Sequence, residues 1–141
     1  MDDMTKHLIK RCAIKNDDLR AALPVNGTTS QLVYLKSAEK ISYTNREFYT
    51  VKLYCGAFRI SPAVVWSQNL WTILKTVRDF SKFNEDNDPF GERNFGNFKI
   101  DSETYYFKID YWEDESMKWG AQNYLRDASW RVVTIYNSKE H

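Results

Sequence analysis

The feature that most constrains the fold is a pair of strand-like segments separated by only three residues. Residues 95–100 and 104–111 are rich in β-branched and aromatic side chains, and Asp101-Ser102-Glu103 lies between them. Strands joined this closely pair as an antiparallel hairpin, because parallel neighbours need a crossover of a dozen or more residues. Residues 31–36 and 47–54, read as a second hairpin, and residues 130–136 are also predicted to be strands. The chain is therefore expected to build a mainly antiparallel sheet.

Two segments carry helical signals. Ser61 is a suitable N-cap and Pro62 a suitable first residue for a helix in which apolar side chains recur near the helical period through residue 81. Residues 5–23 have one apolar face and are followed by Pro24, although Asn16-Asp17-Asp18 could instead cap a second, shorter helix there. No repeat or linker divides the chain. We predict a single α+β domain, residues 1–141: a mainly antiparallel sheet with an N-terminal helix and one long central helix packed on one face.

Charge and hydropathy narrow the classes of function. The net charge of +1 divides into +4 for residues 1–60 (10 basic, 6 acidic) and −3 for residues 61–141 (10 basic, 13 acidic). Neither half has the concentrated positive charge that is typical of a sequence-independent nucleic-acid binder. No apolar run approaches the roughly 18 residues that span a bilayer, and the acidic start is unlike a signal peptide, so a cytoplasmic protein without membrane contact is expected. Cys12 and Cys55 lack disulfide spacing and are expected to be free thiols.

Catalysis built on histidine is not expected. The chain has two histidines, His7 and His141, both near an end, where a side chain is poorly held against a nucleophile. Two cysteines and these histidines do not make a tetrahedral zinc site, and no phosphate-binding glycine motif is present. A non-enzymatic role without a cofactor is therefore favoured.

Three blocks carry a resemblance to a known family. They are N-D-P-F-G-E-R-N-F-G at 87–96, F-K-I-D-Y-W at 107–112 and R-V-V-T-I at 131–135. In order and spacing they resemble a family of small bacterial and plasmid-borne proteins of unknown function, whose members tend to carry His and Asp where this chain has Arg93 and Asn94. Residues 28–49 look like an insertion relative to that family. The resemblance implies a shared small α+β fold and an origin near mobile genetic elements.

The leading hypothesis is a protein-binding module that uses an acidic and aromatic surface. Aromatic side chains are enriched at interface cores, and acidic neighbours favour a basic partner. Together with the plasmid setting implied by the resemblance, this suggests an inhibitor of a host defence complex, of anti-CRISPR or anti-restriction type, whose partner handles nucleic acid. The residues expected to bind that partner are Asp86, Asp88, Glu92, Arg93, Trp112, Glu113, Asp114, Glu115 and Trp119.

Alternatives remain open at this point. Four carboxylates, Asp86, Asp88, Glu92 and Asp110, could converge to hold Mg²⁺ or Mn²⁺ in a metal-dependent hydrolase or nuclease. The motif loop could instead be purely structural, because Asp, Pro and Gly have turn chemistry. Lys108 and Asp110 should share one face of their strand, since strand side chains alternate. The basic N-terminal third could also bind nucleic acid directly, and exposed strand edges are compatible with a homodimer.

Overall fold

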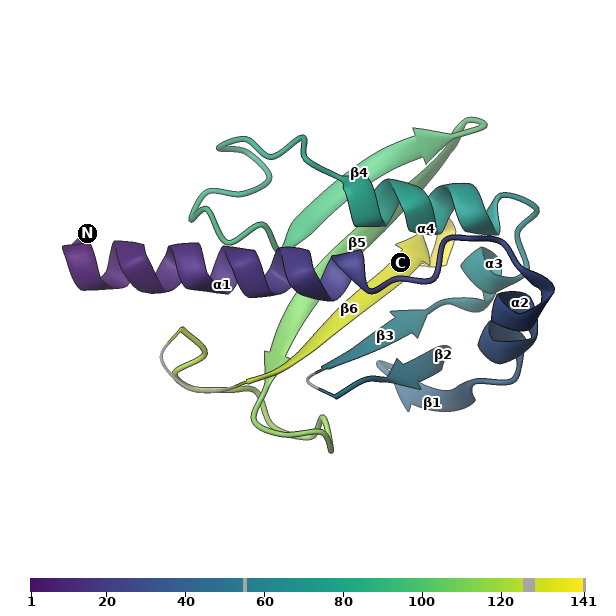
Figure 1. Ribbon diagram of the computed structural model, residues 1–141, viewed down its shortest axis with the longest axis horizontal. Helices are drawn as coiled ribbons and strands as arrows, with labels where there is room; N and C mark the ends of the chain where they lie inside the picture. The colour runs from purple at the N-terminus through teal and green to yellow at the C-terminus, as the bar shows by residue number, and fades with distance from the viewer. Residues whose placement is uncertain (55, 126–128, 141) are drawn as a thin grey trace.

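The helices of the chain pack against a six-stranded sheet (Figure 1). The computed structural model describes residues 1–54, 56–125 and 129–140, so Cys55 and His141 lie outside the described residues. In chain order, the elements are α1 Asp3–Ala21, α2 Thr29–Lys36, β1 Glu39–Tyr43, β2 Arg46–Lys52, β3 Gly56–Ile60, α3 Pro62–Val65, α4 Leu70–Asp79, β4 Phe95–Ile100, β5 Glu103–Trp112, β6 Trp130–Asn137 and the 3₁₀ turn η1 Ser138–Glu140. The strands lie in the order β1-β2-β3-β6-β5-β4. Every pair is antiparallel except β3 with β6, so the predicted α+β class is confirmed.

Two hairpins determine the register of the outer strands. The β4–β5 hairpin closes through Asp101 and Ser102, with Ile100 paired to Glu103. Both turn residues have positive φ, 50° and 68°, as a two-residue type I′ turn requires. The β1–β2 hairpin closes in the same way through Thr44 and Asn45, with φ of 50° and 65°. The predicted hairpin between residues 95 and 111 is therefore confirmed.

The core lies between one face of the sheet and the helices. In Figure 1, α1 and α4 cross in front of the strands. The core takes alternate side chains from the strands, such as Phe58 in β3, Phe107 in β5 and Val133 in β6. Leu19 from α1 and Ile73 from α4 pack against them. Among the described residues, this cluster contains no side chain from the opposite face of the sheet.

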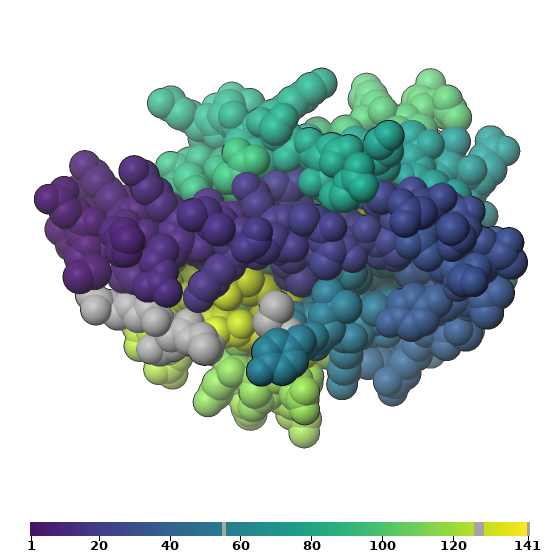
Figure 2. All heavy atoms as spheres, in the orientation of Figure 1, coloured from purple at the N-terminus to yellow at the C-terminus, as the bar shows by residue number. Residues whose placement is uncertain are grey.

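The N-terminal helix is confirmed as one continuous element. Asp2 caps it by accepting a hydrogen bond from the Thr5 backbone N–H at 2.6 Å, and the helix ends at Ala21, before Pro24. The alternative of a second helix capped at residues 16–18 is wrong. The space-filling view shows α1 running across this face of the molecule, with the teal atoms of α4 and the following loop above it (Figure 2). No described helix combines the length and apolar character needed to cross a bilayer.

The single long central helix is a wrong prediction. Ser61 caps α3 as expected, by accepting from the Val64 N–H, but α3 ends at Val65 and α4 begins only at Leu70. The Ser67 hydroxyl accepts a hydrogen bond from the Asn69 N–H at 3.0 Å in the break. Serine and asparagine bind nearby backbone in this way and compete with helix hydrogen bonds.

The first half of the sheet also differs from the prediction. Residues 31–36 lie in helix α2, capped by Thr28, rather than in a strand. Their β-branched and aromatic members Val33 and Tyr34 are exposed, while Leu35 is buried in the core. Strand β1 lies inside the segment predicted to be a polar connection, and β3 was not predicted. The tertiary position of each segment outweighed its β propensity.

Candidate functional site

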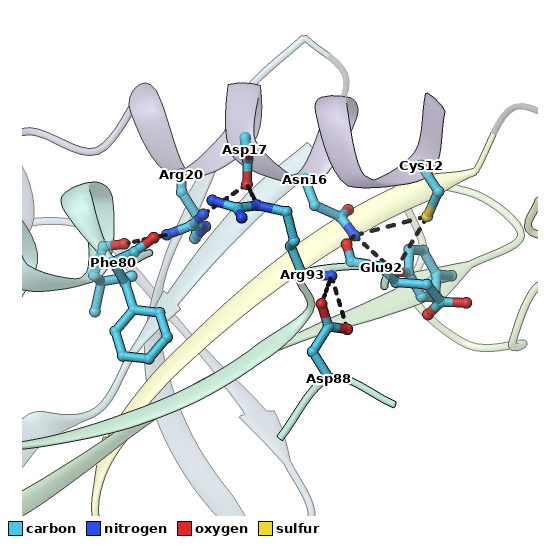
Figure 3. A network of polar contacts seen from close by, with 10 residues as sticks. Cys12, Asn16, Asp17, Arg20, Phe80, Asp88, Glu92 and Arg93 are labelled. Carbon is cyan, nitrogen blue, oxygen red and sulfur yellow. Dashed lines mark hydrogen bonds and ion pairs between the residues drawn. The ribbon is translucent and has the colours of Figure 1, made fainter. Parts of the chain in front are cut away.

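The 84–94 loop that carries the family motif is held by its own side chains. The Asp88 carboxylate accepts hydrogen bonds from the Arg93 backbone N–H with both oxygens, at 3.1 Å each (Figure 3). Gly91 and Arg93 have positive φ, 78° and 58°, so the chain reverses sharply between them. The Arg93 guanidinium lies 4.4 Å from the centroid of the Phe83 ring. Asp88 and Gly91 therefore serve the turn, which fits the structural interpretation of the motif.

The loop docks onto α1 through a buried amide. The Asn16 side chain donates to the Glu92 carbonyl at 3.0 Å and to the Tyr111 hydroxyl at 2.8 Å, and it accepts from Arg131 Nε at 3.1 Å. The Glu92 carboxylate is also buried and accepts from Asn94 at 2.8 Å. Burial raises the pKa of Tyr111. One asparagine thus joins α1, the motif loop and two strands.

A second anchor joins α1 to the end of α4. Arg20 is buried and donates to the carbonyls of Val77 and Phe80, at 2.7 and 3.0 Å. Its other nitrogen binds Asp17 at 2.7 Å, and Asp17 also accepts from Arg93 Nε at 3.0 Å (Figure 3). Burial lowers the pKa of Arg20, and the hydrogen bond to Asp17 opposes this. The guanidinium therefore caps the end of α4, where the Val77 carbonyl otherwise accepts only a long 3.4 Å bond from the Phe80 N–H.

The four carboxylates proposed for a metal site do not come together. Asp86 is exposed, whereas Asp88 and Glu92 bind within the loop. Asp110 lies on the opposite face of the sheet, 3.8 Å from Lys108 Nζ. Within residues 1–54, 56–125 and 129–140, no three His, Cys, Asp or Glu side chains are placed to hold a metal ion. The four carboxylates are apart because Asp88 binds the loop backbone, the Glu92 carboxylate binds Asn94 and Tyr124, and Asp110 lies on the other face of the sheet.

The residues predicted to bind a partner are divided between three places. Asp86, Asp88, Glu92 and Arg93 belong to the motif loop, and only Asp86 among them is fully exposed. Trp112 ends β5 on the face of the sheet away from the helices. The acidic turn, defined as residues 113–119, follows it and exposes Glu113, Asp114, Glu115 and Trp119. These residues do not form the single surface that was predicted.

The face of the sheet away from the helices, here called the open face, is rich in aromatic and basic side chains. The even-numbered residues of β5, including Lys108 and Asp110, point to it, so the prediction that these two share a face is confirmed. By strand register its rings are Tyr43, Phe48, Phe95, Tyr106, Trp112, Trp130 and Tyr136, and its basic residues are Arg46, Lys52, Arg59, Lys99 and Lys108.

The sheet curls over its open face. Tyr43 in β1 and Trp112 in β5 are separated by three strands, which corresponds to about 19 Å in a flat sheet at the usual strand spacing. Their ring centroids are nevertheless 6.0 Å apart. Lys108 Nζ also lies 5.5 Å from the Tyr43 ring. The open face is therefore concave, with β1 folded toward β5.

Arg59 lies at the bottom of this concavity. It is 2% exposed and its guanidinium lies 3.9 Å from the Tyr43 ring centroid and 5.5 Å from that of Trp112. Nη2 binds the Met117 sulfur at 3.3 Å, while Nε and Nη1 have no hydrogen-bond partner among the described residues. Burial lowers the pKa of Arg59, opposed by Tyr43 and Asp110. The buried guanidinium is therefore held mainly by aromatic rings, and its interaction with Tyr43 favours the charged form.

Unpaired polar atoms concentrate on the open face. Within the described chain, seven buried side-chain nitrogen or oxygen atoms have no hydrogen-bond partner, and six of them belong to this face. Each such atom costs about 1–3 kcal/mol when its hydrogen bond is not made, so native folds retain few of them. The six are Arg59 Nε and Nη1, Asp110 Oδ2, Trp112 Nε1, Trp130 Nε1 and Thr134 Oγ1. Asp110 Oδ2 lacks a hydrogen bond but forms an ion pair with Lys108 Nζ at 3.8 Å.

A cavity of about 680 Å³ occupies part of the open face. Rings of Tyr43 and Tyr136 line it together with the cations of Arg46 and Lys108. Thr134, 1% exposed, also lines it. The complete lining is Tyr43, Thr44, Asn45, Arg46, Phe48, Lys108, Thr134, Tyr136 and Glu140. The lining combines flat rings, two cations and an unpaired hydroxyl, which suits an anionic ligand that carries a ring.

Among the described residues, the lining has one carboxylate, and it is already bound within the protein. Glu140 accepts hydrogen bonds from the Ser61 hydroxyl at 2.6 Å and from the Asn137 N–H at 2.8 Å. Its charge therefore stabilises the end of β6 and the start of α3. The cavity retains an excess of positive charge.

Most residues of the open face were missed by sequence reasoning. Arg59 lies in an unpredicted strand, and Tyr43 lies in a segment predicted to be a loop. Thr134 lies in a predicted strand, but only the tertiary structure shows that its hydroxyl is unpaired. The usable signal was the alternation of Lys108, Asp110 and Trp112 along one strand.

Comparison with known proteins gives one match. A family model described as "Protein of unknown function (DUF3768)" matches residues 62–140. This segment runs from α3 to η1 and includes the motif loop, β5 and β6. No curated protein and no solved structure matches the chain.

Proposed function

Because the chain belongs to this DUF3768 family of unknown function, we propose its function from the site itself: a non-enzymatic binding module that holds an anionic, ring-bearing ligand on the open face. The observation that carries the proposal is the gathering of unpaired buried polar atoms on one concave face beside a cavity. A ligand that offers an acceptor to the Thr134 hydroxyl, which lines the cavity, would supply the hydrogen bond this group lacks.

The charges and rings of the cavity support the same ligand class. Lys108 and Arg46 supply positive charge at its lining, and Tyr43 and Tyr136 supply flat surfaces on which a ring can stack. A binding role rather than a reaction is favoured because the described residues of the lining include neither His nor Cys, and the Glu140 carboxylate accepts a hydrogen bond from Ser61.

Titration with uridine monophosphate, followed by NMR of the backbone amides, tests this proposal. Shifts are expected at residues 43–46, 108 and 134–136, and Lys108→Gln should weaken binding about tenfold by removing a charge-assisted contact. The matched control is Lys75→Gln, an exposed lysine on α4, on the other side of the sheet. Shifts confined to α1 and α4, or unchanged affinity in Lys108→Gln, would contradict the proposed site.

A protein partner at the acidic turn is a second candidate, favoured by the exposure of one large ring. Trp119 is 71% exposed beside Glu113, Asp114 and Glu115. The turn is ordered by a hydrogen bond from the Glu113 N–H to the Trp119 carbonyl at 2.8 Å. The acidic turn therefore suits a basic protein partner, for example a nucleic-acid-handling component of a host defence complex.

Charge reversal tests the second candidate. Changing Glu113, Asp114 and Glu115 together to Lys should abolish specific capture of a basic protein from a bacterial lysate, measured by quantitative mass spectrometry against the wild type. Equal capture by both proteins would remove the acidic turn from consideration.

A further inference from the structure

The open face carries a row of rings across three adjacent strands. Phe95 in β4 and Tyr106 in β5 have ring centroids 6.0 Å apart. Tyr106 and Tyr136 in β6 are stacked, with centroids 5.4 Å apart and planes 16° apart. All three side chains are partly exposed. Tyr106 lies between the other two rings, so bases can stack only on the exposed parts of this row, and such stacking accepts any base because each has a π-face.

A second group of rings lies toward the other end of the same face. Tyr43 and Trp112 meet edge to face, with an interplanar angle of 84°. Trp130 is paired with Trp112 in the register of β6 and β5. The two groups are connected through the cavity, whose lining includes both Tyr43 and Tyr136. The face therefore offers ring surfaces on both sides of one hollow, which suits a polymer of bases better than a single ring.

The charges of the open face match a chain of phosphates. Besides the buried Arg59, four basic residues lie on it, whereas strand register places Glu39 and Asp110 there and Glu140 lines the cavity. One of the four, Lys108, forms an ion pair with Asp110 at 3.8 Å. Lys108 and Arg46 lie within the cavity lining, and Lys99 extends the positive charge along β4. The excess is moderate, so phosphate contacts contribute beside stacking rather than dominate it.

From these observations we infer that the open face binds single-stranded nucleic acid, with bases stacked on Tyr106, Tyr136 and Tyr43 and phosphates beside Lys108 and Arg46. This inference rests on the proposed function and specifies its ligand class. A duplex fits less well, because its bases are already stacked inside and a concave face meets only its backbone. Sheet surfaces with exposed aromatic side chains are a recurrent way of binding unpaired bases.

Fluorescence anisotropy with labelled eight-nucleotide oligo-U and oligo-dT tests the inference. Tyr106→Leu and Tyr136→Leu should each weaken binding about tenfold or more, because they remove a stacking ring. Tyr106→Phe and Tyr136→Phe keep the ring and should keep most of the affinity, and comparison of their melting curves with those of the Leu variants separates lost binding from lost folding. The matched control is Tyr34→Leu, an exposed tyrosine on α2.

The salt dependence gives an independent measurement. With about three phosphate contacts, the logarithm of the binding constant should fall against the logarithm of salt concentration with a slope of about −2. A slope steeper than about −5 would indicate binding through a larger basic surface, such as the N-terminal third, and would overturn the assignment to the open face.

The outcomes separate this inference from the proposed function. If uridine monophosphate binds the open face and the oligonucleotide binds no more tightly, the inference is wrong and the proposed function stands. If neither uridine monophosphate nor the oligonucleotide binds, the proposed function and the inference are both wrong. Equal affinity for a duplex of the same length also overturns the inference. A dimer in analytical ultracentrifugation that the Tyr136→Leu change dissociates would show that a second copy occupies the face instead.

Discussion

Replacement of Arg20 by methionine should strongly destabilise the protein. Methionine has a similar length but cannot donate, so the Phe80 carbonyl would lose the bond it now accepts at 3.0 Å, and the Val77 carbonyl would lose its 2.7 Å bond and keep only the Phe80 N–H at 3.4 Å. Loss of each charge-assisted hydrogen bond costs about 1–3 kcal/mol, which gives roughly 2–6 kcal/mol for the two. Loss of the ion pair with Asp17 adds little to this cost, because Asp17 is partly exposed and keeps its ion pair with Arg93.

The expected loss is a large part of the total stability of a domain, which is about 5–15 kcal/mol. At about 3 °C per kcal/mol for a chain of this size, the melting temperature should fall by roughly 6–18 °C. Urea denaturation followed by circular dichroism measures the change, and Arg78→Met, a surface change on α4, serves as the control that leaves the midpoint unchanged. A midpoint for Arg20→Met equal to that of the wild type would refute the capping role of Arg20.

Three further predictions concern single residues. Gly96→Ala should lower the free energy of unfolding by about 1–3 kcal/mol in urea titrations, because the new Cβ would lie 2.5 Å from a ring carbon of Phe107, whereas Gly120→Ala, with 4.0 Å to its nearest contact, should not. Thr134→Val should raise stability by about 1 kcal/mol in thermal melts, because it removes a buried hydroxyl without a partner among the described residues. Burial raises the pKa of the Tyr111 hydroxyl in the folded protein. Above about pH 10 the unfolded chain therefore loses this proton first, and the free energy of unfolding falls as pH rises. Tyr111→Phe should flatten that decline in urea titrations at about pH 9–11.

Elements with local signals were predicted well. The β4–β5 hairpin follows from two strand-like runs around a short turn, and α1 follows from one apolar face that ends before Pro24. The Ser61 cap was also correct, because its hydrogen bond to the Val64 N–H involves residues three apart. In each case the deciding contacts lie within a few positions of the sequence.

Errors arose where distant contacts decide the structure. Residues 31–36 have strand-like composition, yet they lie in α2, where the helical conformation buries Leu35 in the core. The helix predicted to run through residue 81 breaks at residues 66–69, where Ser67 binds the backbone of Asn69. Propensity alone does not anticipate either result, because tertiary burial competes with it.

The motif loop shows a similar limit for function. Its acidic residues suggested a metal or partner site, but Asp88 binds the Arg93 N–H and Glu92 binds Asn94. Asn16, more than seventy positions away in the chain, donates a hydrogen bond to the Glu92 carbonyl and so holds the loop against α1. The sequence alone could not show this, because the partner of each carboxylate depends on how α1 lies against the loop.

Local patterns in the sequence are enough to predict the α+β class, the β4–β5 hairpin, the N-terminal helix and the alternation that places Lys108 and Asp110 on one face. The curl of β1 toward β5, the burial of Arg59 beside Tyr43 and the gathering of buried polar atoms without hydrogen bonds are visible only in the folded protein. The physical reason is the range of the interactions. Turns, caps and alternation depend on neighbours in the chain, whereas curvature and burial depend on strands that meet only after folding.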